Sequence, residues 1–106
     1  MNFQKISNSS KIDQIIYTPK FSAICSIGKA PFSGIAEIKY IPYHWLLEFE
    51  SFEKWLLEIS LTEETIEGMT RLIFDTINET IEPKSLYVSL TASTQVHADV
   101  TAIIKK

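Results

Sequence analysis

The sequence has one cysteine, three glycines and four prolines among its 106 residues. A single cysteine cannot form an intramolecular disulfide, so we expect a protein of a reducing compartment, the cytoplasm. The scarcity of glycine and proline, with a hydrophobic fraction of 45%, is typical of a packed domain and excludes a disordered chain. The length fits one small domain. We expect residues 1–106 to form it, with residues 1–12 as a flexible N-terminal tail.

The sequence also lacks an excess of positive charge and long apolar runs. The net charge is −3 and the only basic cluster is Lys105-Lys106, so stable nucleic-acid binding is not expected. No apolar run approaches the roughly 20 residues of a membrane span, and the first residues lack the apolar segment of a signal peptide. His44 and His97 have no companions at metal-site spacing, so no metal is expected.

The N-terminal third of the chain predicts a β-hairpin. Residues 13–27 carry an apolar side chain at nearly every second position, which is the period of a half-buried strand. Pro19 interrupts this run and indicates an edge strand or a bulge. Residues 28–34 read as a turn, and residues 36–40 then alternate between apolar and charged side chains. These two runs predict an antiparallel hairpin with one apolar face.

The C-terminal third predicts a second hairpin of the same kind. Residues 86–92 alternate between apolar and other side chains, and so do residues 96–104. Ser93-Thr94-Gln95 between them would form the turn. Both strands would turn their apolar positions toward one common core.

Between the hairpins the period becomes helical. Residues 52–59 carry apolar side chains at i, i+3, i+4 and i+7, and residues 66–81 carry a longer stripe that ends before Pro83. Ser51 and Ser60 are the candidate N-caps. The order strand, strand, helix, helix, strand, strand predicts an α+β domain. Two helices would cover one face of a four-stranded antiparallel sheet.

Cys25 is the first candidate functional residue, and it has two interpretations. It lies on the apolar face of its predicted strand, where a free cysteine is usually a small buried hydrophobic residue. It also lies at the end of that strand, before a turn that carries Lys29, where a thiol can act as a nucleophile. The residues alone favour burial, because no basic partner is fixed nearby.

Glu67 is the second candidate, and it also has two interpretations. It lies four residues before Arg71, which lies four residues before Asp75, so the three side chains can form a solvated ladder of ion pairs. Alternatively, its place in the first turns of the predicted helix lets the carboxylate point into a cleft. Both interpretations remain open at this point.

These residues resemble the tunnelling-fold family of pterin- and purine-binding enzymes. The likeness covers residues from about 23 to 90. Within the family it is greatest to the 7-cyano-7-deazaguanine (nitrile) reductases of queuosine biosynthesis, known as QueF, and to their short amidinotransferase relatives. Cys25 stands where that family has its thioimide-forming cysteine, and Tyr40-Ile41-Pro42 matches its strand-ending Tyr-Ile-Pro. Glu67 stands where a glutamate holds the heterocycle.

The resemblance implies a ligand and an assembly. Glu48 and Ser51 match the frame of the reductase motif Glu-x-Lys-Ser-x-Lys and would contribute to substrate binding. The ligand would be a deazapurine, purine or pterin-like ring, attacked by Cys25 and held at its N–H edge by Glu67. The fold family forms barrels from several subunits, so a homo-oligomer is expected.

Four positions depart from the family pattern. Phe32 replaces the proton-donating aspartate, Glu50 and Glu53 replace the two lysines of the cofactor motif, and Ile66 replaces a histidine. Acidic side chains oppose the binding of a phosphate, so no NADPH is expected. The function therefore stays open between two classes. One is a QueF-like enzyme of queuosine-type tRNA nucleoside metabolism, and the other is an inactive ring-binding or structural oligomer of the same fold.

Overall fold

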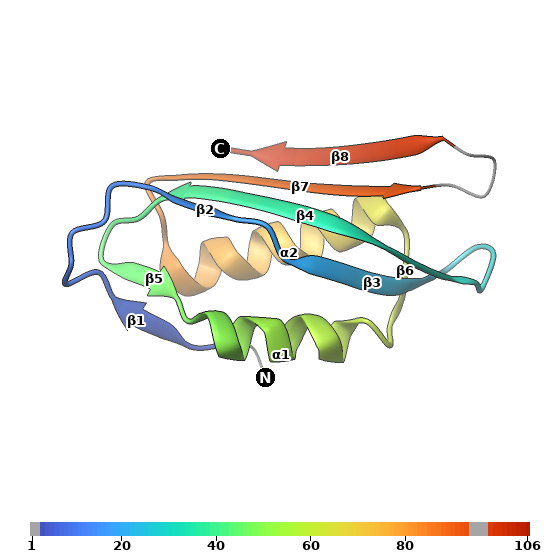
Figure 1. Ribbon diagram of the computed structural model, residues 1–106, viewed down its shortest axis with the longest axis horizontal. Helices are drawn as coiled ribbons and strands as arrows, with labels where there is room; N and C mark the ends of the chain where they lie inside the picture. Colours follow the sequence, from blue (N-terminus) through green and yellow to red (C-terminus); the bar gives the residue numbers. More distant parts are fainter. Residues whose placement is uncertain (1–2, 94–97) are drawn as a thin grey trace.

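The computed structural model describes residues 3–93 and 98–106. The predicted turn at Ser93-Thr94-Gln95 falls largely outside these residues, and so does His97. Figure 1 shows the arrangement of the helices and strands. In chain order they are β1 (Lys5–Ser7), β2 (Ile15–Tyr17), β3 (Lys20–Cys25), β4 (Pro31–Ile41), β5 (Trp45–Leu47), α1 (Phe49–Ile59), β6 (Glu63–Glu64), α2 (Ile66–Ile81), β7 (Ser85–Ser93) and β8 (Asp99–Lys105).

The main sheet is built around the long strand β4. Its strands follow the order β6-β3-β4-β7-β8, and β2 also pairs with β4. All of these pairs are antiparallel except β3 with β6. The helices α1 and α2 lie along one face of this sheet (Figure 1). The predicted α+β order of two hairpins around two helices is therefore confirmed, and β1, β5 and β6 are additional short strands.

Pro19 divides the first predicted strand in two. β2 and β3 lie on either side of it, and both pair with β4. Proline has no N–H to give to a ladder, but its carbonyl still accepts the N–H of Ala36 at 2.8 Å. The interruption predicted at this proline is thus confirmed, and the chain stays attached to β4 across it.

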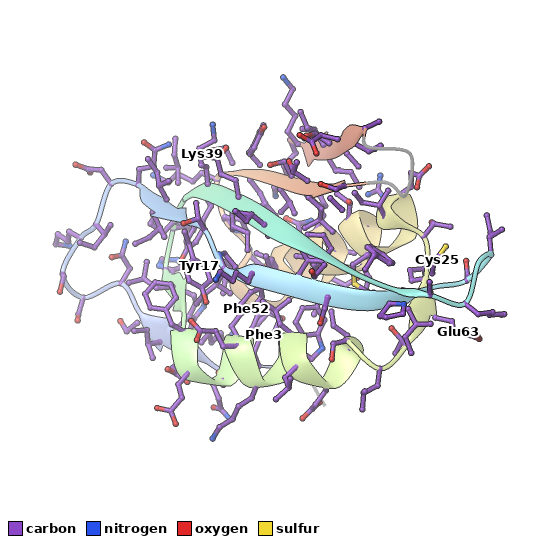
Figure 2. All side chains as sticks on the ribbon, turned by 45° about the vertical axis from the view of Figure 1, so that its right-hand side comes forward. Phe3, Tyr17, Cys25, Lys39, Phe52 and Glu63 are labelled. Atoms are coloured by element: carbon purple, nitrogen blue, oxygen red, sulfur yellow. The ribbon has the colours of Figure 1, made fainter. Side chains whose placement is uncertain are left out.

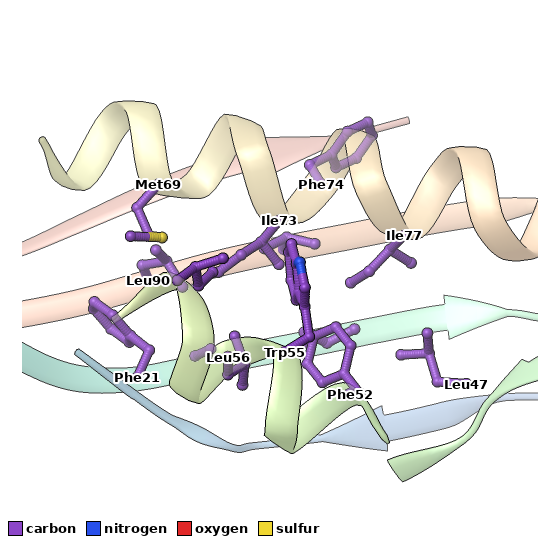
Figure 3. Packing of buried hydrophobic residues seen from close by; sticks show 14 of the residues in the cluster. Phe21, Leu47, Phe52, Trp55, Leu56, Met69, Ile73, Phe74, Ile77 and Leu90 are labelled. Carbon is purple, nitrogen blue, oxygen red and sulfur yellow. The ribbon is translucent and has the colours of Figure 1, made fainter. Parts of the chain in front are cut away.

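The core lies between the sheet and the two helices (Figure 3). The alternating side chains of β4 and β7 face the helices, and the stripes of both helices face the sheet. Burying one large apolar side chain contributes about 1.5–3 kcal/mol, so these periodic residues carry most of the favourable free energy of folding. They include Ile38, Tyr40, Phe52, Trp55, Met69, Ile73, Ile77, Ile81, Leu86, Val88 and Leu90.

The ends of α2 follow local capping rules. The Thr65 hydroxyl accepts the N–H of Gly68 at 3.0 Å, so Thr65 is the N-cap, whereas Ser60 terminates α1. At the other end Glu82 adopts a left-handed backbone with φ of 47° and Pro83 follows. The stop at the proline is as predicted. Among the described residues, neither helix combines the length and apolarity needed to cross a membrane.

Within the described residues the start of the chain is attached to the fold, whereas residues 1–12 were predicted as a flexible tail. β1 pairs antiparallel with β5. The Phe3 ring is 7% exposed and packs edge-on against Phe52 and Trp55, with ring centroids 4.8 and 5.1 Å apart. The sequence does not indicate this pairing, because a three-residue strand carries no periodicity and its partner lies about forty residues away.

Phe3→Ala is expected to lower the free energy of unfolding by about 3 kcal/mol, because it removes a buried ring from between two aromatic partners. Urea denaturation followed by circular dichroism measures this loss. Gln4→Ala is the matched control, since the Gln4 side chain is exposed and its backbone is unchanged. Equal stability of the Phe3→Ala variant and the parent chain would contradict the packing role of this segment.

Candidate functional site

The end of β3, the strand β6 and the start of α2 meet at one end of the molecule, which holds Cys25 (Figure 2). The parallel register of β3 and β6 sets Glu64 beside Cys25. The N–H of Ser26 donates to the Glu64 carbonyl at 3.3 Å, which extends the pairing past the strand. Because α2 begins two residues after Glu64, its first turn with Glu67 lies at the same end. We call this region the Cys25 end.

The Cys25 thiol is partly exposed and lies in a tight turn. The N–H of Cys25 donates to the Ala30 carbonyl at 2.9 Å, and the N–H of Lys29 donates to the Cys25 carbonyl at 2.8 Å. The N–H of Gly28 donates to Sγ at 3.4 Å. This N–H and that of Ile27 lower the pKa of the thiol, partial desolvation opposes them, and the Lys29 charge adds to the lowering. The turn therefore favours the thiolate, which is the nucleophilic form.

Lys29 ties this turn to β6. Its backbone is left-handed, with φ of 59°, and its ammonium group lies 2.8 Å from the carboxylate of Glu63. Both side chains are exposed, so the pair contributes little free energy by itself. Its consequence is electrostatic, because it keeps a cation at the Cys25 end close to the thiol.

The Glu67 side chain is exposed in the first turn of α2. Within the described part of the chain it makes no hydrogen bond or ion pair, since Arg71 contacts Asp75 instead, at 3.1 Å. The predicted ladder is thus present between Arg71 and Asp75 only. The Glu67 carboxylate is left available to a ligand at the Cys25 end.

Glu64 is a residue of this end that the sequence did not indicate. Its carboxylate accepts the N–H of Thr65 at 2.9 Å and lies against the first turn of α2. A Cβ added at Gly68 would collide with this carboxylate, so the glycine leaves room for it. Glu64 could not be recognised from the sequence, because the pairing of β6 with β3 joins residues about forty positions apart.

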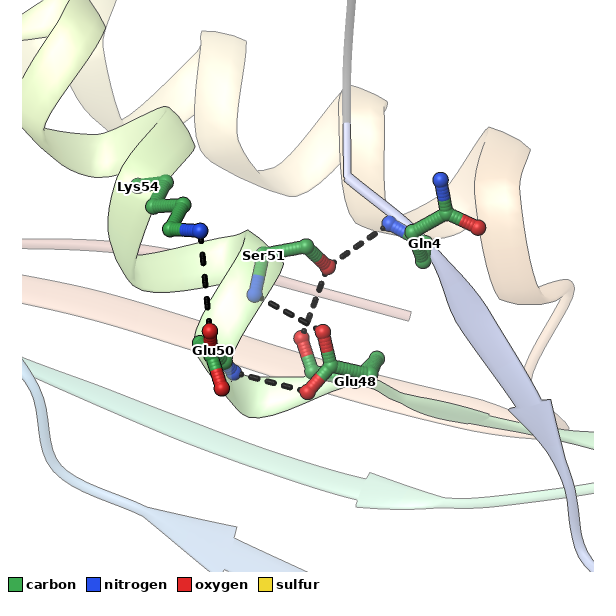
Figure 4. A network of polar contacts seen from close by, with 5 residues as sticks. All are labelled: Gln4, Glu48, Glu50, Ser51 and Lys54. Carbon is green, nitrogen blue, oxygen red and sulfur yellow. Dashed lines mark hydrogen bonds and ion pairs between the residues drawn. The ribbon is translucent and has the colours of Figure 1, made fainter.

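Glu48 and Ser51 lie at the start of α1 (Figure 4). The Glu48 carboxylate accepts the N–H groups of Ser51 and Glu50 at 2.8 and 2.9 Å, which lowers the pKa of that carboxyl. Glu48 is therefore the N-cap of α1, which corrects the prediction of Ser51. The Ser51 hydroxyl instead accepts the N–H of Gln4 at 2.9 Å and donates to the Glu48 carbonyl at 3.1 Å.

The predicted site residues consequently fall into two groups. Cys25 and Glu67 share one end of the molecule, whereas Glu48 and Ser51 lie at the far end of α1. A helix rises 1.5 Å per residue, so α1, with 11 residues, separates its two ends by roughly 16 Å. One chain does not bring all four residues together.

Known proteins resemble this chain in sequence and in fold. NADPH-dependent 7-cyano-7-deazaguanine reductases of Chlorobium phaeobacteroides strain BS1 and Chlorobaculum parvum are each 30% identical to it, over 74 and 73 residues. These stretches cover 70% and 69% of this chain and 63% of each reductase. The crystal structure of the archaeosine synthase QueF-Like in the apo form superposes with a TM-score of 0.84 at 17% identity. The superposition covers 90% of this chain and 94% of the archaeosine synthase chain.

The chain resembles the 7-cyano-7-deazaguanine reductases in sequence, and it has the tunnelling fold of the QueF-like archaeosine synthase. The resemblance found in the sequence is thereby confirmed at the level of family likeness and fold. The chain spans about 63% of the length of the reductases it matches, less than two thirds. A comparison with descriptions of protein families finds no match.

The positions that depart from the QueF pattern have structural partners of their own. Phe32 packs its ring edge-on against Phe21, with ring centroids 6.2 Å apart. Glu50 lies 3.5 Å from Lys54, and Glu53 accepts the Tyr17 hydroxyl at 2.6 Å. Burial first, and then this hydrogen bond, raise the pKa of the Tyr17 phenol. The described residues contain no group of three or more side chains suited to a metal ion.

The pH dependence of alkylation tests the thiolate turn. Iodoacetamide should react with Cys25 with a midpoint below that of an unperturbed thiol, because the Gly28 N–H stabilises the thiolate. Gly28→Pro removes this donor and should raise the midpoint. Gly28→Ala keeps the N–H, and its added Cβ meets no atom within 4 Å, so it should leave the midpoint unchanged. A wild-type midpoint at or above that of a free cysteine would contradict this account.

Proposed function

We propose that the chain is a QueF-like protein of queuosine- or archaeosine-type tRNA nucleoside metabolism, in which Cys25 forms a covalent adduct with a nitrile-bearing 7-deazapurine. The observation that carries the proposal is the partly exposed Cys25, in a turn that lowers the pKa of its thiol. Glu67, which has no partner among the described residues, lies at the same end. The reductases that resemble the chain are named for 7-cyano-7-deazaguanine, which is such a nitrile.

The chemistry at this end is the addition of a thiol to a nitrile. The Cys25 thiolate attacks the nitrile carbon and forms the C–S bond, while one electron pair of the C≡N bond moves to nitrogen. The nitrogen then takes a proton from solvent and a thioimide results. The Glu67 carboxylate, which has no partner among the described residues, accepts N–H groups of the ring and orients it.

A site that also uses Glu48 and Ser51 requires two copies of the chain. These residues lie at the opposite end of α1 from Cys25, so a second subunit would have to supply them. The free side of β8 supports association, since β7 is its sole strand partner among the described residues and Ile103 is 51% exposed. Such an open edge favours pairing with another chain. We therefore propose a homo-oligomer with sites between subunits.

The residues present do not fit NADPH. The positions that would meet its phosphates carry Glu50 and Glu53, and Lys54 is the one cation paired with either acid in the described chain. These exposed carboxylates repel an anionic cofactor. Phe32 offers no proton where a reduction would need one. We therefore expect no hydride transfer from NADPH to the thioimide.

An amidine-forming reaction is the second candidate. It is favoured by the fold that the chain shares with the archaeosine synthase QueF-Like, over 94% of that chain. An amine such as ammonia would add to the thioimide carbon, and the Cys25 thiol would leave and regain its proton. If no adduct forms, the remaining candidate is a ring-binding or structural oligomer without chemistry.

Incubation with 7-cyano-7-deazaguanine should increase the mass of the intact protein by one ligand on Cys25. The adduct should be absent in Cys25→Ala and should form roughly tenfold more slowly in Glu67→Gln, which loses a charged hydrogen bond of about 1.4 kcal/mol. Glu79→Gln, an exposed glutamate of the same helix, is the matched control. A thiol that reacts with iodoacetamide but never with the nitrile would rule out the adduct.

Mixed oligomers test the shared site. Cys25→Ala and Glu48→Ala should each fail to form the adduct efficiently when alone. Co-refolded in equal amounts, they should restore about a quarter of the sites, because random assembly joins an intact Cys25 to an intact Glu48 at that frequency. Intact-protein mass spectrometry reports the adduct, and light scattering reports the assembly. A stable monomer that forms the adduct normally would refute a site between subunits.

A further inference from the structure

A concave region lies at the end of the molecule opposite Cys25. It is a cavity of about 710 Å³ between residues 7–13, residues 41–45 and Lys84. This volume lies within the usual range of about 300–1,000 Å³ for small-molecule sites. Neither Cys25 nor Glu67 belongs to its lining, so the adduct chemistry makes no use of it. We call it the Lys84 cavity.

Side-chain hydrogen bonds of Asn8 hold the walls of this cavity together. Its amide oxygen accepts the N–H of Ile12 at 2.8 Å, and its amide nitrogen donates to the carbonyls of Ile12 and Tyr43 at 3.2 and 3.4 Å. The N–H of Asn8 also donates to the His44 carbonyl at 2.9 Å. Two segments about thirty-five residues apart are thereby fixed to each other. The cavity is a built feature and not a gap between loose loops.

The lysines of the cavity lack acidic partners. Lys11 and Lys84 both line it, and within the described chain neither forms an ion pair with a carboxylate. Asp13 is the single carboxylate among the lining residues. Among the other described cations, Lys29, Lys39, Lys54 and Arg71 each lie within 4.0 Å of a carboxylate, whereas Lys5, Lys20, Lys105 and Lys106 also form no ion pair.

The same wall carries aromatic rings. Tyr43 is 56% exposed, and the Lys84 ammonium lies 5.3 Å from the centroid of its ring. The His44 ring lies against Tyr43 at a tilt of 36°, with centroids 3.8 Å apart, and Trp45 also lines the cavity. An exposed aromatic surface beside unneutralised ammonium groups suits a ligand with an anionic group and an organic body.

We infer that the Lys84 cavity binds a small phosphate-bearing molecule. Lys11 and Lys84 supply two compact positive charges for the phosphate oxygens, and hydroxyl groups of the 7–9 segment supply neutral donors. A metal ion would need more acidic or imidazole ligands than Asp13 and His44 provide. Asp13 opposes the anion and limits its affinity, so its removal should strengthen binding.

Titration with inorganic phosphate and with phenyl phosphate tests this site. Changes in Trp45 fluorescence and in the amide NMR signals of residues 8–13 should saturate with either compound. Lys11→Met and Lys84→Met should each weaken binding about tenfold, and Asp13→Asn should strengthen it severalfold, since tenfold corresponds to about 1.4 kcal/mol of charge interaction. Lys20→Met, which removes a lysine outside the cavity, is the matched control.

The two probes separate the sources of the anion. Tighter binding of phenyl phosphate means that the aromatic wall holds an organic body, and equal binding means that the site takes phosphate itself. Affinities that are unchanged in Lys11→Met and Lys84→Met, or equally weakened in Lys20→Met, would overturn the inference. So would the absence of any saturable signal. Adduct formation at Cys25 should be the same in these variants, which keeps this test independent of the proposed function.

Discussion

The short parallel pairing of β3 with β6 is the constraint on which the candidate site depends. It consists of two residue pairs, with flanking hydrogen bonds from Ile24 N–H to the Thr62 carbonyl and from Ser26 N–H to the Glu64 carbonyl. These bonds return the connection between the helices to the sheet edge. They thereby fix where α2 begins, and with it the position of Glu67. Without them, Cys25 and Glu67 would belong to unrelated parts of the surface.

The periodic elements could be predicted because each of them repeats one burial pattern many times. β7 alternates through Leu86, Val88 and Leu90, and α2 buries Met69, Ile73 and Ile77 at helical spacing. The short strands β1, β5 and β6 have no such repeat, and their pairing depends on residues far away in the chain. Their existence follows from tertiary packing. The cap of α1 was misplaced by three residues for a similar reason, since the first turn begins before its apolar stripe.

The candidate site illustrates where pattern reasoning ends. Alternation in β3 buries Phe21 and Ala23, and continuing it predicts that Cys25 is buried too. The alternation of burial ends at Ile24 and Cys25, which are both partly exposed at the strand end. The family resemblance identified Cys25 and Glu67, and the fold brings them to one end. Spacing along the chain could not predict that Glu48 lies far from Cys25 and Glu67. It also could not predict that Glu63 and Glu64 of β6 lie beside the Cys25 turn.

Lys29, in the turn after Cys25, has a left-handed backbone, and this conformation limits which residues suit the position. A non-glycine residue at φ of 59° carries a backbone cost of about 1–2 kcal/mol, which its exposed ion pair with Glu63 offsets only in part. Glycine would relieve the backbone but would remove the cation beside the thiol. At position 29, glycine would tolerate the positive φ without strain, and lysine supplies a positive charge. No natural side chain has both properties. A glycine at position 29 would therefore gain backbone freedom and would lose one of the smaller contributions that lower the pKa of the Cys25 thiol.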